Sequence, residues 1–497
     1  MRFKLGRFKY EPKVLRFLTR LVVHDLPQKK IFIGGGMLPE VYEILSNIAI
    51  GMGENPQIIS DQSNLSIATI KPKKLKSLLI NVGQLRLLIQ LPKYYFIVLR
   101  SIIKPRSKRN FFENQLYSSY YGVALIKNTE GRIYLSLKAK VIGFIGVITS
   151  TTKFAILKNA KVSTFVMAHM VYGARAIIAW AREYDLEVFA SANHTIFRLR
   201  PDEDDYVHIR PRHAYGELAN IIDKSDLDRF WQKKQTGESG SAEWDFAAQG
   251  TRTITEGVNI VFLHVFRDSP FICIGPSGIF SDYIEWVDKT LEIVKESAEP
   301  WIFKFHPSSV RWGESPERWA KIWREKHALD KHPHIQFIFS DLSNHQAIEK
   351  SRRIVTYSGR VQLEALAVGK QSICILNSVT SRFSNDGCMC PESIEEYRNL
   401  LISPSGESGV VNEYTRIMAK SIMYAQSNLY SYADIAGAKR IFRNENNDLA
   451  VKMRIFETVK KSVQKESMYF RRLGHLLETG ALDISYTPKY LKQLRLM

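Results

Sequence analysis

The sequence is poor in cysteine, with four in 497 residues, and these four do not have the paired spacing of a zinc site. The N-terminal segment MRFKLGRFKYEPKVLRF also lacks the continuous apolar stretch of an export signal. Both absences argue against a disulfide-stabilised secreted protein and favour a reduced, cytoplasmic setting. The C-x-C of DGCMC, residues 386–390, leaves a soft-metal or redox site open beside an ordinary pair of cysteines.

Long apolar runs are missing as well, since no stretch reaches the about 18 uninterrupted apolar residues of a membrane-spanning helix. Residues 78–103 come nearest, but Arg86, Lys93 and Arg100 interrupt them, so we predict no transmembrane helix. Long proline- or glycine-rich and repetitive tracts are absent too, which excludes a solenoid or a largely disordered chain. A 497-residue chain with 45% hydrophobic and 24% charged residues is expected to form at least two globular domains.

Acidic residues are missing from one segment of a chain whose formal net charge is +20. Between Gln62 and Phe112 there are eleven Lys or Arg and no Asp or Glu, with aromatic and aliphatic residues among them. Apolar side chains among cations suit an anionic bilayer, so we expect residues 62–112 to contact the surface of the inner membrane. A solvated basic face and a nucleic-acid contact are the alternatives, and no nucleic-acid-binding motif is present.

The second half of the chain alternates strand-like and helix-like segments. VNIVFLHVF, WIFKF, IQFIF, RIVTY and QSICIL are apolar and β-prone, and helical periodicity appears between them in SDYIEWVDKTLEIVKES, SPERWAKIWREKHA, NHQAIEKS and VQLEALAVG. Strands and helices that alternate with short connections indicate a parallel sheet covered by helices on both faces. Residues 256–412 are therefore predicted to form a Rossmann-like domain.

The first half contains similar units, although they are less regular. KIFIGGGMLPEVYEILSNIAIGMG is typical of a strand, a glycine turn and a helix, and residues 162–192 are typical of a strand, a helix and a strand. A polar stretch that contains Gly and Ser then indicates a boundary near residue 255. We predict an α/β protein with two Rossmann-like domains facing a cleft, residues 1–255 and 256–412, followed by a helical segment, residues 413–497.

Polar residues follow three strands of the second predicted domain. Asp268 lies after VNIVFLHVF, His306 and Pro307 follow WIFKF, and Ser358 and Gly359 follow RIVTY. Ligands of open α/β sheets bind outside the carboxyl ends of the strands, so we expect these residues on one rim. A second His-Pro pair, at residues 332–333, precedes its strand and is not expected to act chemically.

The chemistry of this rim suits a nucleotide. Ser358 and Gly359 can hold a phosphate through a hydroxyl and backbone N–H groups, and Glu364 can accept hydrogen bonds from a ribose. His306 can donate to the same phosphate, and Asp268 can serve as nucleophile or base. The structural alternatives are a helix cap for Ser358, a solvated surface position for Glu364, a backbone contact for His306 and a turn for Asp268.

FKFHPSS, followed about fifty residues later by IVTYSGRVQLEALAVGKQSICI, resembles two signatures of bacterial capsule and surface-polysaccharide glycosyltransferases. These signatures are lysine-x-His-Pro and S-x-G/T-x-x-x-E-A-x-x-x-G-K. The resemblance is to the capsule-biosynthesis family that includes the retaining β-Kdo transferases, and it covers residues 258–378. It implies the GT-B fold and a CMP-activated sugar donor, with no metal or other cofactor required.

The resemblance also implies roles for individual residues. Asp268 matches the aspartate nucleophile of the β-Kdo enzymes, with Asp282 as a second candidate, and His306 is the other residue expected to act in catalysis. The family tends to have glutamine four positions before that aspartate, where this chain has His264. The donor nucleotide is expected to contact Lys304, His306, Pro307, Ser308, Thr356, Ser358, Gly359 and Glu364.

The acceptor is expected on the first domain. Gly35 lies in the turn after a predicted strand, and RPRHAYGELAN offers Arg210 and Arg212, with His213 and Glu217, for an anionic saccharide. The alternative for Gly35 is an ordinary strand-to-helix connection. No DxD pair stands at an obvious strand end, and we interpret DEDDY, residues 202–206, as a solvated loop, so no metal site is predicted.

These observations predict a cytoplasmic, retaining glycosyltransferase of capsule or lipopolysaccharide biosynthesis, peripheral on the inner membrane. It would move Kdo or another acidic sugar from a CMP donor to a lipid-linked or oligosaccharide acceptor. A UDP-sugar epimerase or polyol-phosphate transferase with the same two-domain frame is the enzymatic alternative. A basic protein that binds nucleic acid or acidic glycan without turnover is the third hypothesis.

Overall fold

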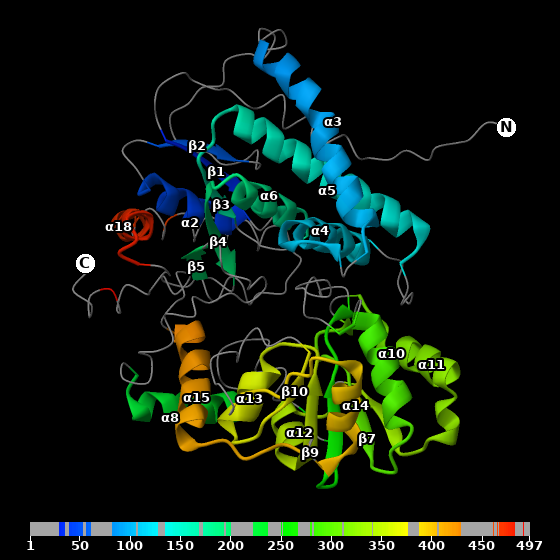
Figure 1. The fold of residues 1–497 in the computed structure, drawn as a ribbon. Coiled ribbons are helices and arrows are strands. Elements are labelled where there is room, and N and C mark those ends of the chain that lie inside the picture. The colour runs from blue at the N-terminus through cyan, green and yellow to red at the C-terminus, as the bar shows by residue number, and fades with distance from the viewer. Residues whose placement is uncertain are drawn as a thin grey trace, which may run out of the picture.

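The protein forms two α/β lobes, one above the other in Figure 1, and each lobe is built on a five-stranded sheet. This computed structural model describes residues 29–34, 39–52, 56–60, 82–105, 108–127, 135–167, 172–192, 195–199, 222–236, 250, 252–266, 279–280, 283–310, 313–339, 341–375, 387–404, 407–428, 461, 465, 467–482 and 491. The predicted α/β class with two Rossmann-like domains is confirmed.

The sheet of the first lobe has the strand order β2-β1-β3-β4-β5. Its strands are β1 (Lys30–Gly34), β2 (Gln57–Ser60), β3 (Thr164–Met167), β4 (Glu187–Ala192) and β5 (Thr195–Arg198). The first four are parallel, whereas β5 pairs antiparallel with β4. The pattern of the sequence did not predict β5, because its four residues are too few to show an alternation.

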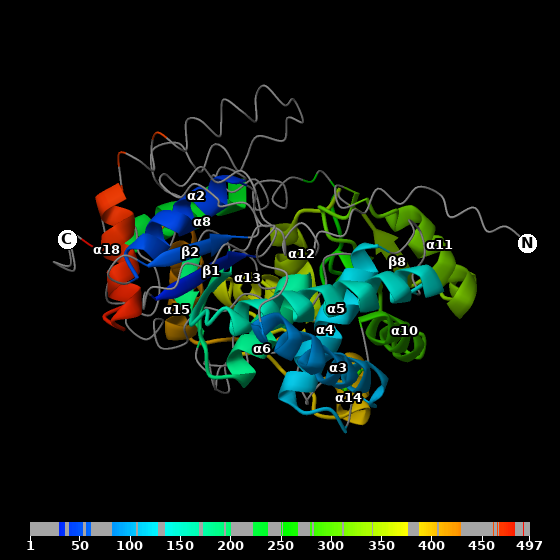
Figure 2. The same ribbon diagram turned by 90° about the horizontal axis from the view of Figure 1, so that it is seen from above.

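Six described helices accompany this sheet. They are α2 (Pro39–Ile50), α3 (Val82–Ile103), α4 (Phe111–Ile126), α5 (Leu137–Asn159), α6 (Tyr172–Glu183) and, from the far end of the chain, α18 (Ser467–Glu478). Figure 2 shows α18 beside α2. The two helices approach closely because Gly51 and Gly474 have no side chain, and a Cβ on Gly474 would collide with the carbonyl oxygen of Ile48.

Helix α5 is long and apolar enough to cross a membrane, judged by length and composition alone. A search for uninterrupted apolar runs missed it, because Lys138, Lys140 and Lys153 divide its sequence. Half of the most apolar stretch of α5 is buried inside the protein. Gly143 lies against α4, and Thr151 accepts a hydrogen bond from Trp180 of α6. Helix α5 is thus a packed helix of the first lobe.

The sheet of the second lobe has the order β10-β9-β6-β7-β8, and all its neighbouring strands are parallel. Its strands are β6 (Val258–Phe262), β7 (Trp301–Lys304), β8 (Ile335–Ile338), β9 (Ser351–Thr356) and β10 (Ile373–Cys374). The helices between them are α10 (Tyr283–Val294), α11 (Pro316–His327), α12 (Asn344–Lys350) and α13 (Val361–Ala367). These strands and helices correspond to the strand-like and helix-like segments of the sequence.

Three further described helices belong to the second lobe: α8 (Lys224–Thr236), α14 (Ile394–Ile402) and α15 (Glu413–Asn428). Helix α8 precedes the boundary expected near residue 255, yet it packs on α15, with the ring of Phe230 against that of Tyr424. Of the C-terminal segment, α15 therefore lies on the second lobe and α18 on the first (Figure 1).

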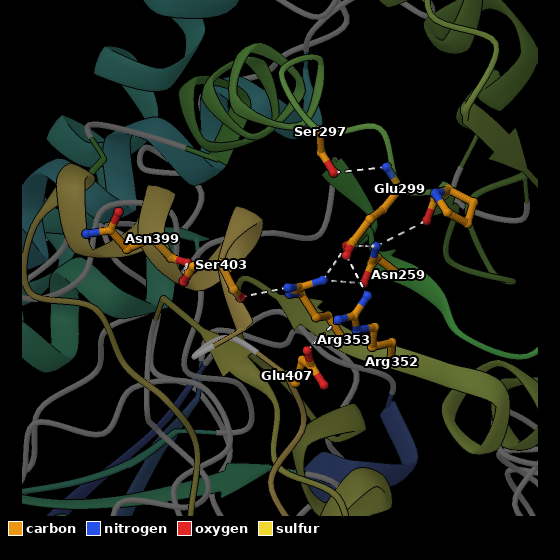
Figure 3. A network of polar contacts seen from close by, with 9 residues as sticks. Asn259, Ser297, Glu299, Arg352, Arg353, Asn399, Ser403 and Glu407 are labelled. Atoms are coloured by element: carbon orange, nitrogen blue, oxygen red, sulfur yellow. Dashed lines mark hydrogen bonds and ion pairs between the residues drawn. The ribbon is translucent and has the colours of Figure 1, made fainter.

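The amino-terminal edge of the second sheet holds a buried polar network (Figure 3). Arg353 of β9 is 1% exposed and forms an ion pair with Glu299, and its guanidinium also donates to Asn259 over 3.1 Å and to the carbonyl oxygen of Ser403 over 2.6 Å. The side-chain amide of Asn259 donates to Glu299 over 2.9 Å. These contacts tie β6, β9 and the residues around them together at the edge opposite to the predicted site.

Candidate functional site

The carboxyl ends of the strands in the second sheet are level with one another. The strand register pairs Phe262 of β6 with Lys304 of β7 and with Thr356 of β9, and it pairs Lys304 with Ile338 of β8. Because residues at one level of parallel strands lie at one edge of the sheet, the segments that follow them emerge together. The structure thus brings the loops after β7 and β9 to a common rim, as the sequence pattern predicted.

His306 stands two residues after β7, at the start of a turn, and is half-buried. The backbone N–H of Ser308 donates to Nδ1 of His306 over 3.1 Å. Burial lowers the pKa of His306 to about 3, and nearby His264, Lys304 and Arg360 add to this effect, because a second positive charge beside them is unfavourable. The ring is therefore neutral with its proton on Nε2, and Nε2 has no hydrogen-bond partner among the described residues.

The loop after β9 is fixed by a contact from the end of β6. His264 is half-buried, and its Nε2 is hydrogen-bonded to the carbonyl oxygen of Ser358. Gly359 has a φ of 121°, and a Cβ at this position would lie 2.8 Å from Cε1 of His264. Glycine is needed here both for the backbone conformation and for the approach of the histidine ring. Thr356 also faces this loop, since its hydroxyl donates to the carbonyl oxygen of Ser358 over 3.1 Å.

A chain of side-chain contacts links three segments of the rim. Lys304 Nζ donates to Oδ1 of Asn344 over 2.8 Å, and Nδ2 of Asn344 donates to Oε2 of Glu364 over 3.4 Å. The other carboxylate oxygen of Glu364 accepts from Lys234 Nζ over 2.7 Å. The side chains of Lys234 and Glu364 are 10% and 8% exposed, so this ion pair is nearly buried. The interpretation of Glu364 as a solvated surface residue is therefore wrong.

Lys304 is a buried cation without a close carboxylate among the described residues. Burial lowers the pKa of its ammonium group to about 8, although the negative charges of Glu364 and Asp341 raise it. A buried ammonium group whose pKa is about 8 is suited to pair with an anion that binds at the rim.

Several expected site residues lie outside the part of the chain that the structure describes. These are Asp268 and Asp282 of the second domain, and Gly35, Arg210, Arg212, His213 and Glu217 of the acceptor side. Their roles stay predictions. Pro307 and Ser308 are described, half-buried in the turn that His306 begins. Within the described residues, no group of three or more His, Cys, Asp or Glu side chains is placed to hold a metal ion.

Sequence reasoning missed two residues of the rim, Asn344 and Lys234. Asn344 is the first residue of α12, shortly after β8, so the rule that selected the other loops applies to it as well. Lys234 gave no such signal, because it lies in a polar stretch that was assigned to the linker before the second domain. Only the packing of α8 on the second lobe brings it to Glu364.

No protein-family model and no curated protein matches the sequence. Among solved structures, the chain is similar to the UDP-GlcNAc 2-epimerase of Methanocaldococcus jannaschii, with 14% identity over 80% of this chain and 98% of that one and a TM-score of 0.29. It is also similar to KpsC of Thermosulfurimonas dismutans, a β-Kdo 2,4 transferase, with 14% identity over 54% and 80% and a TM-score of 0.31. The UDP-GlcNAc 2-epimerase of Neisseria meningitidis matches at 11% identity over 80% and 99%, with a TM-score of 0.24. Similarities of this size decide neither the substrate nor the reaction.

Proposed function

We propose that the protein is a glycosyltransferase of bacterial surface-polysaccharide biosynthesis that uses a CMP-activated acidic sugar, Kdo or a related one. The observation that carries the proposal is the rim itself. Neutral His306 with its donor N–H, buried Lys304 and the loop of Gly359 lie together where the parallel strands end. The carboxylate of Glu364 lies beside them and is fixed by Lys234. This combination suits a phosphate bonded to a ribose.

In this proposal His306 and Lys304 stabilise the leaving nucleotide. When the bond between the sugar and the phosphate breaks, the electron pair goes to the phosphate oxygen, and negative charge grows there. Nε2–H of His306 donates to that oxygen, and the positive charge of the Lys304 ammonium group stabilises the negative charge that grows there. Glu364 binds the ribose hydroxyls through lone pairs that Lys234 and Asn344 do not use.

The retaining outcome is assigned to Asp268 by the resemblance. Its carboxylate would attack the anomeric carbon while CMP leaves, which forms a sugar ester on the enzyme. An acceptor hydroxyl would then displace the carboxylate and lose its proton to a base. For Asp268→Asn we expect CMP binding without transfer, and for wild type a sugar adduct in the intact-mass spectrum with donor. A fully active Asp268→Asn enzyme excludes this role.

The nucleotide site is tested by the thermal shift that CMP produces. We expect CMP to raise the melting temperature of the wild type, and we expect His306→Ala and Glu364→Ala to reduce that shift. His332→Ala is the matched control, because its histidine belongs to the other His-Pro pair and lies in a connection before β8. The proposal is wrong if CMP gives no shift and both rim variants bind donor as wild type does.

Product analysis with CMP-, UDP- and GDP-sugars and CDP-glycerol separates the enzymatic alternatives. Turnover of a CMP-sugar in the presence of a glycan acceptor supports the proposal. Conversion or hydrolysis of UDP-GlcNAc with inert CMP-sugars assigns an epimerase, and use of CDP-glycerol assigns a polyol-phosphate transferase. Salt-sensitive binding of nucleic acid or glycan without any turnover assigns a binding protein.

For the acceptor side we propose contact with an anionic membrane through α3 and α5. Ile89, Phe96 and Ile103 recur every seven residues on α3 and are 71%, 66% and 71% exposed. Leu137, Val141 and Ile145 recur every four residues on α5 and are at least half exposed. Such spacing makes one stripe on each helix.

The two stripes lie on helices that pack together. The hydroxyl of Tyr95 on α3 is 2.8 Å from that of Thr152 on α5, and Thr152 lies on the same side of α5 as Ile145, two turns away. Neither helix contains Asp or Glu, and both carry exposed lysines such as Lys93, Lys138 and Lys140. Apolar residues flanked only by cations match an anionic lipid surface. The proposed surface thus combines α5 with the described part of the basic segment 62–112, of which residues 62–81 and 106–107 lie outside the described residues.

Cosedimentation with vesicles tests this contact. We expect binding to phosphatidylglycerol vesicles, little binding to phosphatidylcholine vesicles, and a loss on Phe96→Ser/Ile103→Ser or Leu137→Ser/Val141→Ser. Val410→Ser is the control, because Val410 is 93% exposed but lies in the second lobe. Equal vesicle binding by all variants contradicts the assignment.

A further inference from the structure

Cys374 and Cys390 are 16 positions apart in the sequence and lie next to each other at the edge of the second sheet. Cys374 ends β10, and a parallel bridge pairs the preceding Ile373 with Met389. The N–H of Cys374 donates to the carbonyl of Met389 over 3.0 Å, and the N–H of Met389 donates to that of Ser372 over 2.9 Å. In this register Cys374 is level with Cys390, and side chains that are level in paired strands point to the same face.

The thiols of this pair are in contact. The Sγ atoms of Cys374 and Cys390 are 3.0 Å apart. Paired strands lie about 4.7–4.9 Å apart, which is inside the about 4.4–6.8 Å between Cα atoms that a disulfide needs. A third thiol is close, since Cys388 lies on the same face as Cys390 and its Sγ is 3.2 Å from the hydroxyl of Ser372. The described residues offer no metal-binding group of three, so the geometry favours thiol chemistry over a metal site.

We propose that Cys374 and Cys390 are a modification site that forms a reversible disulfide with low-molecular-weight disulfides of the glutathione type. The thiolate of Cys390 attacks one sulfur of the oxidant, which releases one small thiolate and leaves a mixed disulfide. The thiolate of Cys374 then attacks the sulfur of Cys390 and releases the second small thiol. Two protein thiols are oxidised to one disulfide, and the oxidant is reduced to two thiols.

The difference in burial assigns the order of these steps. Cys390 is half-buried, whereas Cys374 is fully buried, so we expect a small oxidant to reach Cys390 first. Burial raises the pKa of the Cys374 thiol, so it is a poor nucleophile toward reagents in solution. Its contact with Cys390 lets it act within the protein once the mixed disulfide has formed. Disulfides of cytoplasmic proteins are commonly transient and redox-sensing, which fits a pair of this kind.

The pair is one strand away from the candidate nucleotide loop. Cys374 is level with Thr356 in the register of β9 and β10, and the N–H of Ile375 donates to the carbonyl of Tyr357 over 3.1 Å. Disulfide formation brings the sulfurs from 3.0 Å to a bond of about 2.05 Å and covalently ties the end of β10, which borders the loop after Thr356, to the segment of Cys390. This consequence rests on the proposed function: the oxidised protein is expected to bind CMP several-fold more weakly.

The test is peptide mapping of wild-type protein after incubation with glutathione disulfide. We expect one cross-linked pair of peptides, carrying Cys374 and Cys390, which reduced glutathione separates again. Cys388→Ser should keep the cross-link, and Cys390→Ser should lose it. The proposal is overturned if both thiols stay open to alkylation, if glutathione remains on Cys390, or if Cys374 joins Cys388 instead. Mapping of the wild type needs no variant to fold.

CMP affinity of the reduced and oxidised forms separates this inference from the proposed function. A cross-link with unchanged CMP binding refutes the coupling and leaves the nucleotide site standing. A cross-link in a protein that binds no nucleotide refutes the proposed function and leaves the disulfide standing. Cys273→Ser serves as the control that oxidation of the fourth cysteine does not cause the change.

Discussion

The two edges of the second sheet use similar residues in different ways. At the amino edge, the guanidinium of Arg353 is paired with the carboxylate of Glu299 and bonded to Asn259. At the carboxyl edge, the ammonium of Lys304 donates to the neutral amide of Asn344, and Nε2–H of His306 has no partner among the described residues. Polar groups matched in charge stabilise a fold, whereas donors without a matching anion are suited to receive a ligand. We therefore expect the amino edge to contribute to the stability of the fold and the carboxyl edge to bind a ligand.

The largest effect is expected from breaking the amino edge. Arg353→Met removes the buried guanidinium that donates to Asn259 and to the carbonyl oxygen of Ser403, and leaving these two acceptors without their donor should lower the free energy of unfolding by about 2–4 kcal/mol. Arg352→Met is the control, because Arg352 also contacts Glu299 but is 39% exposed, and a surface pair contributes about 0–1 kcal/mol. Urea unfolding measures both. Equal losses in the two variants, or a loss of CMP affinity in folded Arg353→Met protein, would contradict the contrast.

The carboxyl edge should show the opposite behaviour. His306→Ala removes a donor to a charged phosphate and should weaken CMP binding about 10- to 100-fold, which corresponds to about 1.5–3 kcal/mol. The free energy of unfolding should change little, since the His306 ring makes a single hydrogen bond with the described part of the chain, the one from the N–H of Ser308. Calorimetric titration and urea unfolding of the same samples measure the two quantities. A variant that unfolds easily but binds CMP normally would refute the assignment.

Lys304 makes the comparison dependent on pH. Its ammonium group is charged below the pKa of about 8 and neutral above it, so CMP affinity should fall as the pH rises through that value. Lys304→Gln should bind more weakly at pH 7 and lose this dependence. His306, with a pKa near 3, should add no step between pH 5 and 8. Affinities measured from pH 6 to 9.5 test this, and a flat wild-type profile would show that Lys304 does not meet the phosphate.

The smallest effect is expected at Lys234, which holds Glu364 without reaching the phosphate. Lys234→Met should free one carboxylate oxygen and change CMP affinity only a few-fold. Because Glu364 is assigned to the ribose, the ratio of CMP to 2′-deoxy-CMP affinity should fall toward one. Lys233→Met is the matched control, since Lys233 is its exposed neighbour on α8. An unchanged ratio in Lys234→Met would remove Lys234 from the positioning role.

Most of the second lobe was predictable from the sequence for a physical reason. Its strands are buried on both faces and read as apolar runs, and its helices have clear starts, such as Pro316 in α11 and Ser343 before α12. Parallel strands then force the loops after them to one rim. His306, Ser358 and Gly359 could therefore be selected without coordinates.

Other features depend on packing that no local pattern encodes. Lys234 reaches Glu364 only because α8 crosses the boundary expected near residue 255. The meeting of Cys374 with Cys390 needs a strand pairing outside the regular alternation. The contact of His264 with Ser358 joins two strand ends 94 positions apart, and no local pattern in the sequence predicts that this histidine fixes the loop.

The carboxyl edge of the second sheet is the proposed nucleotide-binding site. Hydrogen exchange of backbone amides, measured by mass spectrometry with and without CMP, tests it most directly. We expect slower exchange in residues 304–309 and 356–366 and unchanged exchange around Asn259, Glu299 and Arg353. Protection confined to the amino edge or to the first lobe, or no protection at saturating CMP, would contradict it.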